Sequence, residues 1–415
     1  MPWQIAASDR TTLRELAKRV AEIAADPVQD ERREIWYAQN ALEPIRPPVF
    51  VSPDYSWEEL IPDDALACES EYAREIEVAL RRRIYAHEHF GDDQVVDADW
   101  CVPHALRRTG RGLAKKIREP EMRTGAHAYE PVIESMEDVE RLRTPTAEHD
   151  PEESERRIAW HEELFGDILR VRLHGVWWWS LGLIDEWTPL RGIQQTYLDM
   201  MDNPELLHAG MRRLMEGRLA WLDQLEQQGV LSLNNANDYV GSGCFGFTRK
   251  LPQEDFDGHV RPRDMWGFCE AQTMAAVSPA MHEEFVLRYQ LPILERFGLN
   301  CYGCCEPLDR MLDLLLERVP RLRRVSISAW ADVRRSAEQL GDRAIFSWKP
   351  DPAALAAVSF DADALRASIR ETVEICADHG CALEIVMRTT HTCNNRPERF
   401  DRCAEIAMEE ARRAE

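Results

Sequence analysis

The second half of the chain alternates short apolar segments with amphipathic helical segments, and this alternation restricts the fold more than any other feature. Buried strands that alternate with amphipathic helices and short turns are typical of a parallel sheet. From residue 266 onward the alternation is regular, with glycine between helix and strand at 298, 341 and 380. The segments that we predict as strands are 94–100, 168–173, 230–233, 266–270, 299–302, 323–327, 343–346 and 381–387.

Eight such segments favour a closed (β/α)8 TIM barrel over an open doubly wound sheet. A barrel of this kind needs about 250 residues, so a chain of 415 residues leaves a large N-terminal extension. No Gly-x-Gly-x-x-Gly turn comes directly after any of the segments, which argues against an open dinucleotide-binding sheet. We therefore predict an α/β protein with an N-terminal helical extension over residues 1–90. The barrel is expected over 91–415, with a helical insertion at 102–165.

Composition restricts the partners and the compartment. The chain carries 74 acidic against 51 basic residues, for a formal charge of −23. Such a surface repels phosphate backbones and anionic lipids, so we expect neither a nucleic-acid nor a membrane partner. Eleven cysteines are too few for a disulfide scaffold, and no signal-peptide or membrane-length apolar segment occurs. We expect a cytoplasmic protein with reduced thiols that binds a small-molecule substrate.

Polar and thiol side chains follow the predicted strands where active sites of parallel barrels form, at the carboxyl ends of the strands. A barrel without a catalytic or binding role would not need polar or thiol side chains at these positions. The residues that we place there are His174, Trp178, Asn234, Tyr239, Glu270, Cys304, Cys305, Glu306, Ser328, Lys349, Arg388 and His391.

Cys304, Cys305 and His391 are the most specific chemical feature of the predicted strand ends. Thiolates and imidazole are preferred zinc ligands, and a catalytic zinc site needs three protein ligands. Because adjacent cysteines rarely bind one ion without strain, Cys304 is favoured over Cys305, and Glu306 is a further candidate. We predict that these four residues hold the metal, with Cys393 a competing ligand. The alternative is that the cysteines are ordinary small buried residues.

Four strand-end residues are candidates for catalysis. Arg388 suits a bidentate contact with a carboxylate, and Lys349 suits an anion or a Schiff base. Tyr239 and Glu270 are suited to proton transfer. A surface role is the alternative for Lys349. The Gly- and aromatic-rich loop 237–250 is interpreted as a mobile lid, with an ordinary connection as the alternative.

Three more strand-end residues are predicted to contact a cofactor. Trp178 lies in a run of three tryptophans and would stack on a planar ligand; the alternative is packing against the N-terminal helices. His174 and Asn234 follow the strands at 168–173 and 230–233.

The segment 299–308, with the sequence LNCYGCCEPL, resembles the uroporphyrinogen decarboxylase superfamily. Its nearest branch is the zinc-dependent methyltransferases that act with corrinoid proteins. Those enzymes carry a His-x-Cys-Gly strand end; Cys304 matches the cysteine and Tyr302 stands in place of the histidine. Their third ligand, a cysteine on the last strand, is matched most closely by the position of His391, ahead of Pro397. The resemblance covers roughly residues 160–415.

The resemblance implies a zinc-dependent methyl- or alkyl-transferase that acts on a small thiol or a corrinoid-linked substrate. Zinc is the implied cofactor, together with a corrinoid carried by a partner protein. A decarboxylase of a carboxylated small molecule is the alternative, although the Arg-Gln-x-Gly-Arg stretch of the decarboxylase branch is absent from the sequence. A non-catalytic tetrapyrrole-binding protein is the other alternative.

Overall fold

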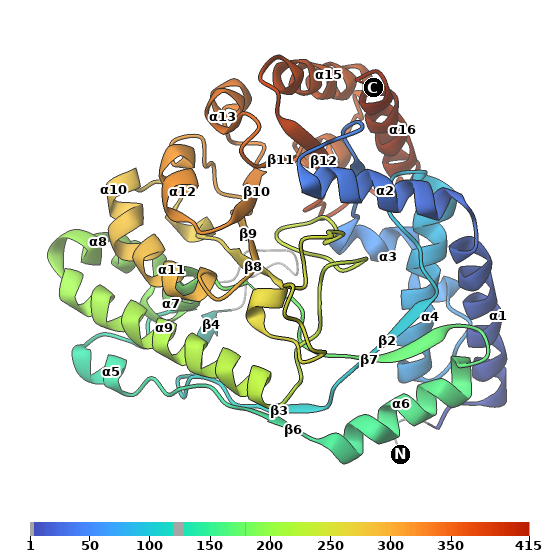
Figure 1. The fold of residues 1–415 in the computed structure, drawn as a ribbon, viewed down its shortest axis with the longest axis horizontal. Helices are drawn as coiled ribbons and strands as arrows, with labels where there is room; N and C mark the ends of the chain where they lie inside the picture. Colours follow the sequence, from blue (N-terminus) through green and yellow to red (C-terminus); the bar gives the residue numbers. More distant parts are fainter. Residues whose placement is uncertain (1–3, 119–127, 179, 415) are drawn as a thin grey trace.

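A six-stranded parallel sheet forms the centre of the computed structural model, which describes residues 4–118, 128–178 and 180–414 (Figure 1). The strand order is β1-β12-β11-β10-β9-β8. Its strands are β1 (Val49–Val51), β8 (Trp266–Cys269), β9 (Leu299–Tyr302), β10 (Leu322–Ile327), β11 (Ile345–Trp348) and β12 (Ala382–Met387). The strands from β8 to β12 follow the sequence order, which confirms the predicted strand–helix alternation from residue 266 onward.

Helices that connect these strands cover the outer face of the sheet (Figure 1). Their apolar stripes are buried, as for Ala337 and Leu340 of α13, while their polar faces are exposed. Aspartates begin two of them: Asp332 accepts from Arg335 N, and Asp361 accepts from Ala364 N. These helices are α7 (Leu183–Arg191), α8 (Ile193–Asp202), α9 (Pro204–Gln227), α10 (Pro279–His282), α11 (Arg288–Leu294), α12 (Leu312–Arg318), α13 (Val333–Leu340), α14 (Ala353–Ala356), α15 (Ala362–Asp378) and α16 (Glu398–Arg412).

The N-terminal part consists largely of helices. It contains α1 (Ala7–Ala24), α2 (Val28–Ala41), α3 (Trp57–Leu60) and α4 (Glu71–Tyr85). The apolar stripe of α1 is buried, and the same core cluster contains residues of α4, such as Leu80. This part also supplies β1, which pairs with β12 through Val51 and Met387, so one strand of the sheet comes from the first 90 residues.

Residues 99–174 contain strands as well as helices. Here β2 (Asp99–Pro103) pairs in parallel with β7 (Arg170–His174) as a separate two-stranded sheet. Among the described residues between them lie two antiparallel pairs and two helices, so the segment predicted as a helical insertion is of mixed structure. The antiparallel strands are β3 (Leu106–Arg108) with β6 (Ala147–His149) and β4 (Lys116–Arg118) with β5 (Ala128–Glu130); the helices are α5 (Met136–Glu140) and α6 (Pro151–Phe165).

Within the described ranges, the sheet does not close into the predicted eight-stranded barrel. The strand expected at 94–100 starts at Asp99, and the one expected at 230–233 is reduced to a bridge between Leu231 and Val176. The extended stretch before Val51 becomes β1 because its backbone finds partners far along the chain: Val49 N donates to Asp93 at 2.8 Å, and β12 lies alongside.

A short hairpin from Tyr239 to Phe245 lies inside the curve of the sheet (Figure 1). Cys244 is completely buried and Phe245 packs edge-on against Phe50 of β1. A Cβ atom on Gly241 would lie 2.9 Å from the Cβ atom of Cys301, so only glycine fits at this approach. The apolar residues of this loop, which we interpreted as a mobile lid, pack as core.

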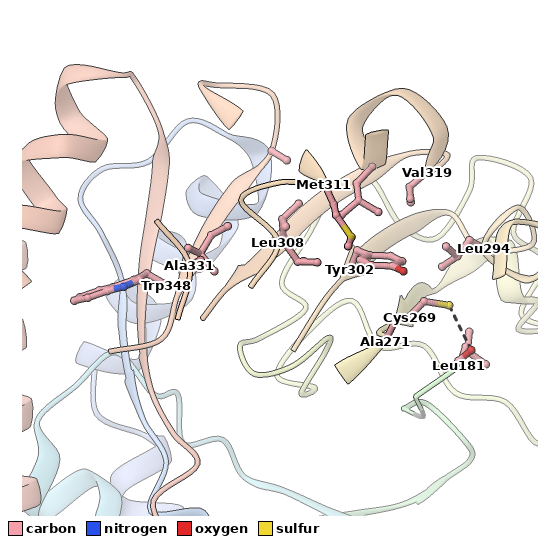
Figure 2. Close-up of a cluster of buried hydrophobic side chains, with 14 of the residues drawn as sticks. Leu181, Cys269, Ala271, Leu294, Tyr302, Leu308, Met311, Val319, Ala331 and Trp348 are labelled. Carbon is pink, nitrogen blue, oxygen red and sulfur yellow. Dashed lines mark hydrogen bonds between the residues drawn. The ribbon is translucent and has the colours of Figure 1, made fainter. Parts of the chain in front are cut away.

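The main core lies between the sheet and the outer helices. Figure 2 shows Tyr302 of β9 among Leu308, Met311 and Leu294, with the Cys269 thiol directed to the carbonyl oxygen of Leu181 at 3.6 Å. Along the described chain, no helix is long and apolar enough to cross a bilayer.

Candidate functional site

Two adjacent thiols lie directly after β9. The Sγ atoms of Cys304 and Cys305 are 3.7 Å apart, and both side chains are partly buried. Gly303 precedes them with a φ of +88°, a conformation that places the two thiols beyond the end of the strand and favours glycine. The pair therefore stands at the carboxyl edge of the sheet, where the sequence placed it.

The environment of the pair stabilises a thiolate at Cys305. The hydrogen bond between the two thiols lowers the pKa of Cys305 and raises the pKa of Cys304. Burial opposes ionisation of both groups, whereas the positive charges of Arg388 and Lys349 lower the pKa of Cys305. A thiolate, not a thiol, is the reactive form of cysteine.

Glu270, directly after β8, is the acidic group beside the thiols. It is 7% exposed, and burial raises its pKa. Its carboxyl group has hydrogen-bond partners in Ser180, Cys304 and Gln272, the last at 2.8 Å. A carboxyl group that retains its proton next to a nucleophile is suited to act as a general acid.

Glu306 joins the ends of two strands. Its Oε1 accepts from Ala271 N at 2.8 Å and its Oε2 accepts from Cys304 N at 2.9 Å. The side chain is 4% exposed, and burial raises its pKa to about 7. Because each oxygen already binds a backbone N–H, Glu306 fixes Glu270 beside the thiols and is a poor metal ligand.

Lys349 follows β11 and is buried. Its Nζ donates to Ser347 O at 3.0 Å and to Ser347 Oγ at 2.7 Å. Burial lowers the pKa of its ammonium group to about 8, which makes this lysine easier to deprotonate than an exposed one.

Arg388, after β12, contacts the hairpin inside the sheet. Its guanidinium donates to the Tyr239 hydroxyl at 2.5 Å and to the Ser242 carbonyl oxygen, and its Nε lies 3.4 Å from Asp54. Burial is the largest influence on the pKa of Tyr239 and raises it, so the phenol is not a base near neutral pH. Tyr239 positions Arg388, and its proton-transfer role stays a prediction.

A buried ion pair lies beneath these groups. Arg324 Nε donates to Glu384 at 2.8 Å, and its NH2 group donates to Asn40 of α2 at 2.6 Å. Both charged side chains are almost fully inaccessible. This pair connects β10, β12 and the N-terminal helices below the site.

The three residues predicted to contact a cofactor make different contacts within the protein. Asn234 is structural, since its amide bonds to Trp177 O, Trp266 O and Trp266 N. His174 is buried with its Nε2 atom 3.2 Å from Asp238. Trp178 is 42% exposed and its indole N–H donates to Gly241 O at 2.9 Å, so it packs against the hairpin.

The described residues do not fit the predicted zinc set. His391 is exposed and stacks on Tyr55, with ring centroids 4.6 Å apart. Both oxygens of Glu306 bind backbone N–H groups. Across the described parts of the chain, no three His, Cys, Asp or Glu side chains are grouped as metal ligands. The competing candidate Cys393 donates to Glu59 at 3.0 Å instead.

The sequence missed two residues that shape the site. Asp54 lies beside Arg388 and also accepts from Thr389 N at 2.6 Å. Had the extended segment 46–51 been counted as a strand, Asp54 would have been a strand-end candidate. Ser242, whose carbonyl oxygen accepts from Arg388 and whose hydroxyl meets Ser326 at 3.1 Å, gave no sequence signal beyond its two neighbouring glycines.

Comparison with known proteins does not assign a family. The sequence matches no protein-family model and no curated protein. Among solved structures, a methyltransferase from Methanosarcina mazei is similar over 91% of this chain and 98% of that chain, with 12% sequence identity and a TM-score of 0.49. At that identity and score the likeness supports no conclusion about activity.

Proposed function

We propose that the protein transfers a methyl or other small alkyl group through the sulfur of Cys305. The observation that carries this proposal is the thiol pair, with its Sγ atoms 3.7 Å apart and the pKa of Cys305 lowered beside two cations. Low-pKa thiolates are effective nucleophiles near neutral pH, and they are also good leaving groups. A transfer to and from sulfur uses both properties.

In the first step, the Cys305 thiolate attacks the alkyl carbon of a donor. The sulfur–carbon bond forms while the carbon–leaving group bond breaks, and the leaving group departs with the electron pair. Glu270, whose protonated form is favoured because burial raises its pKa, donates a proton to a basic leaving group. Glu306 keeps Glu270 next to the thiols through its two backbone contacts.

In the second step, an acceptor thiolate removes the alkyl group from Cys305. The new sulfur–carbon bond forms on the acceptor, and Cys305 leaves with the bonding pair as a thiolate. The hydrogen bond with Cys304 and the charges of Arg388 and Lys349 stabilise this leaving thiolate. The predicted cofactors, zinc and a corrinoid on a partner protein, stay predictions, and neither step depends on them.

We also infer that the two parallel sheets are parts of one barrel. The support is a set of backbone contacts between them: Val176 bridges to Leu231, and Leu181 N donates to Phe268 O at 3.0 Å. On the other side, Asp93 N donates to Val49 O at 3.0 Å, which ties β1 to the segment ahead of β2. In such a barrel, the thiols and the two cations would share one mouth.

The test uses methylcobalamin as the donor and 2-mercaptoethanol as the acceptor. The wild-type protein should consume methylcobalamin and form the methyl thioether, with a transient methyl group on Cys305 detected by mass spectrometry. Cys305→Ser should abolish both signals, whereas Cys101→Ser, at an exposed cysteine of β2, should leave them unchanged. Equal turnover by Cys305→Ser and the wild type would contradict the proposal.

The decarboxylase alternative is supported by a specific observation, since Arg388 and Lys349 would hold a carboxylate and Glu270 would supply the proton. The cysteines would then be dispensable. A protein that shows no thiol methylation, and whose Cys305→Ser variant still releases carbon dioxide from a bound carboxylic acid, would support that alternative.

A further inference from the structure

Among the described residues, the site contains a buried cation without a counter-ion. Lys349 is 8% exposed, and within the described ranges its ammonium donates only to the hydroxyl and carbonyl oxygens of Ser347, on its own strand. In the described portions of the chain, no carboxylate lies within 4.0 Å of its Nζ atom. Glu384 acts on it only from a greater distance, and that carboxylate is already bound by Arg324. Buried charges in proteins are normally paired, so this ammonium is suited to receive an anion.

A buried hydroxyl without a partner lies next to this lysine. Ser328 is 3% exposed, and within the described structure its Oγ makes no hydrogen bond. In the register of the sheet Ile327 pairs with Trp348, and Lys349 N donates to Ile327 O at 2.9 Å. Ser328 and Lys349, the next residues on these two strands, are therefore neighbours.

The strand register also shows that these groups face the inside of the sheet. Ser326 contacts Ser242 of the hairpin through its hydroxyl and pairs with Ser347. Side chains two residues apart on a strand share a face, so Ser328 and Lys349 point to the same side as Ser326 and Ser347.

Arg388 supplies a second cation on the neighbouring strand. Its Nε makes no hydrogen bond within the described structure and lies 3.4 Å from Asp54. Its charge lowers the pKa of Lys349, so the two cations are close enough to repel each other. An anion between them would relieve this repulsion.

We propose that the ends of β10, β11 and β12 form an oxyanion subsite, in which Lys349 and Ser328 bind the anionic head group of the substrate and the positive charge of Arg388 stabilises it. This inference rests on the proposed function, because the head group is placed so that the rest of the molecule reaches Cys305. The substrate class is then a small molecule with a carboxylate or another oxyanion at one end and the alkyl-accepting or alkyl-donating sulfur at the other.

The binding test uses 3-(methylthio)propionate as the probe and its neutral counterpart 3-(methylthio)propanol as the matched control. By titration calorimetry, the acid should bind at least about tenfold more tightly than the alcohol, since a hydrogen bond to a charged group is worth roughly that factor. Lys349→Met should remove this preference, and Ser328→Ala should weaken binding of the acid severalfold. Lys250→Met, at an exposed lysine, should change nothing. Competition with acetate, sulfate and inorganic phosphate identifies the preferred head group.

A protection experiment needs no variant and so does not depend on folding of Lys349→Met. The chain has five lysines, at 18, 115, 116, 250 and 349, and the first four are exposed. The acid should slow acetylation of Lys349 by N-acetoxysuccinimide at least about fivefold, as expected when a charge-assisted contact blocks the amine, while the alcohol should have no effect. The four exposed lysines serve as internal controls.

Equal binding of acid and alcohol, or an unprotected Lys349 with the acid bound, would overturn the subsite. Failure of the subsite and failure of the proposed alkyl transfer can be distinguished. Loss of methyl transfer in the presence of intact Lys349 protection would refute alkyl transfer alone, and methyl transfer without any preference for the acid would refute the subsite alone.

Discussion

Arg388 donates a hydrogen bond to the hydroxyl of Tyr239 at 2.5 Å and so ties the end of the last strand to the hairpin inside the sheet. The same guanidinium contacts the carbonyl oxygen of Ser242 in that hairpin. A residue predicted only to bind substrate therefore also holds an interior segment in place.

Removing the Tyr239 hydroxyl should destabilise the protein. Tyr239→Phe leaves a buried guanidinium N–H without its acceptor, which costs about 1–3 kcal/mol. Urea denaturation should show a lower free energy of unfolding by this amount. Tyr55→Phe, at a residue 68% exposed, is the control and should have no measurable effect. An unchanged stability of Tyr239→Phe would show that this contact contributes nothing.

Gly241→Ala tests the close packing of the hairpin. The added Cβ would lie 2.9 Å from the Cβ atom of Cys301, at a residue with a φ of +62°. Gly229→Ala is a matched control, because Gly229 has a φ of +64° but no atom within 4 Å of an added Cβ. Both variants place an alanine at a positive φ, so both lose stability through backbone strain. The difference between their free energies of unfolding therefore reports the steric clash with Cys301. We expect Gly241→Ala to lose about 1–3 kcal/mol more than Gly229→Ala. Equal losses would mean that the hairpin adjusts freely.

Removing one partner of the buried ion pair between Arg324 and Glu384 should cost far more stability than breaking a surface pair. Arg324→Met leaves the Glu384 carboxylate buried without its partner, and removal of one partner typically costs about 3–5 kcal/mol. Arg249→Met breaks the exposed pair with Glu34 and should cost about 0–1 kcal/mol. Thermal or urea unfolding of both variants measures the two losses of stability. Similar losses in Arg324→Met and Arg249→Met would refute the prediction.

Cys305 should react with iodoacetamide at a lower pH than an ordinary thiol, whose pKa is about 8.5. Its pKa is lowered by the hydrogen bond with Cys304 and by the nearby cations, so its rate of alkylation should reach half-maximum below that value. Cys304→Ala should move the midpoint upward. Cys101, the exposed cysteine of β2, is the internal comparison in the same mass-spectrometric experiment. A midpoint for Cys305 at or above the one for Cys101 would count against thiolate stabilisation.

Glu306 should make stability fall as pH rises through the acidic range. Burial raises its folded-state pKa from 4.5 to about 7, so the folded state binds more protons than the unfolded state between these values. Linkage then requires that its contribution is full below about pH 4.5 and is lost as pH rises toward 7. Glu306→Gln should flatten this part of the curve in urea unfolding at several pH values. Asp92, with a pKa also raised to about 7, contributes in the same window, so Asp92→Asn serves as the comparison. If the free energy of unfolding of Glu306→Gln changed with pH as steeply as that of the wild type, Glu306 would be excluded as a source of this pH dependence.

The sequence was informative about the site wherever a side chain follows a regular strand. Glu270, Cys304, Cys305, Lys349 and Arg388 were all identified from the alternation of strands and helices, and the structure brings them to one edge of the sheet. Their identity follows from local order, because parallel strands end at a common edge. His391 stacks on Tyr55, and both oxygens of Glu306 bind backbone N–H groups; no spacing in the sequence reveals these contacts.

By itself, the sequence determined the strand–helix alternation from residue 266 and the chemistry available at the strand ends. These depend on periodicity and capping, which are local. Only the tertiary structure decided that residues 49–51 form a strand of the sheet, that residues 239–245 fill its interior, and that Lys349 is buried without a counter-ion. Each of these results from contacts between segments far apart in the chain, where burial and hydrogen bonding with distant partners outweigh local preference.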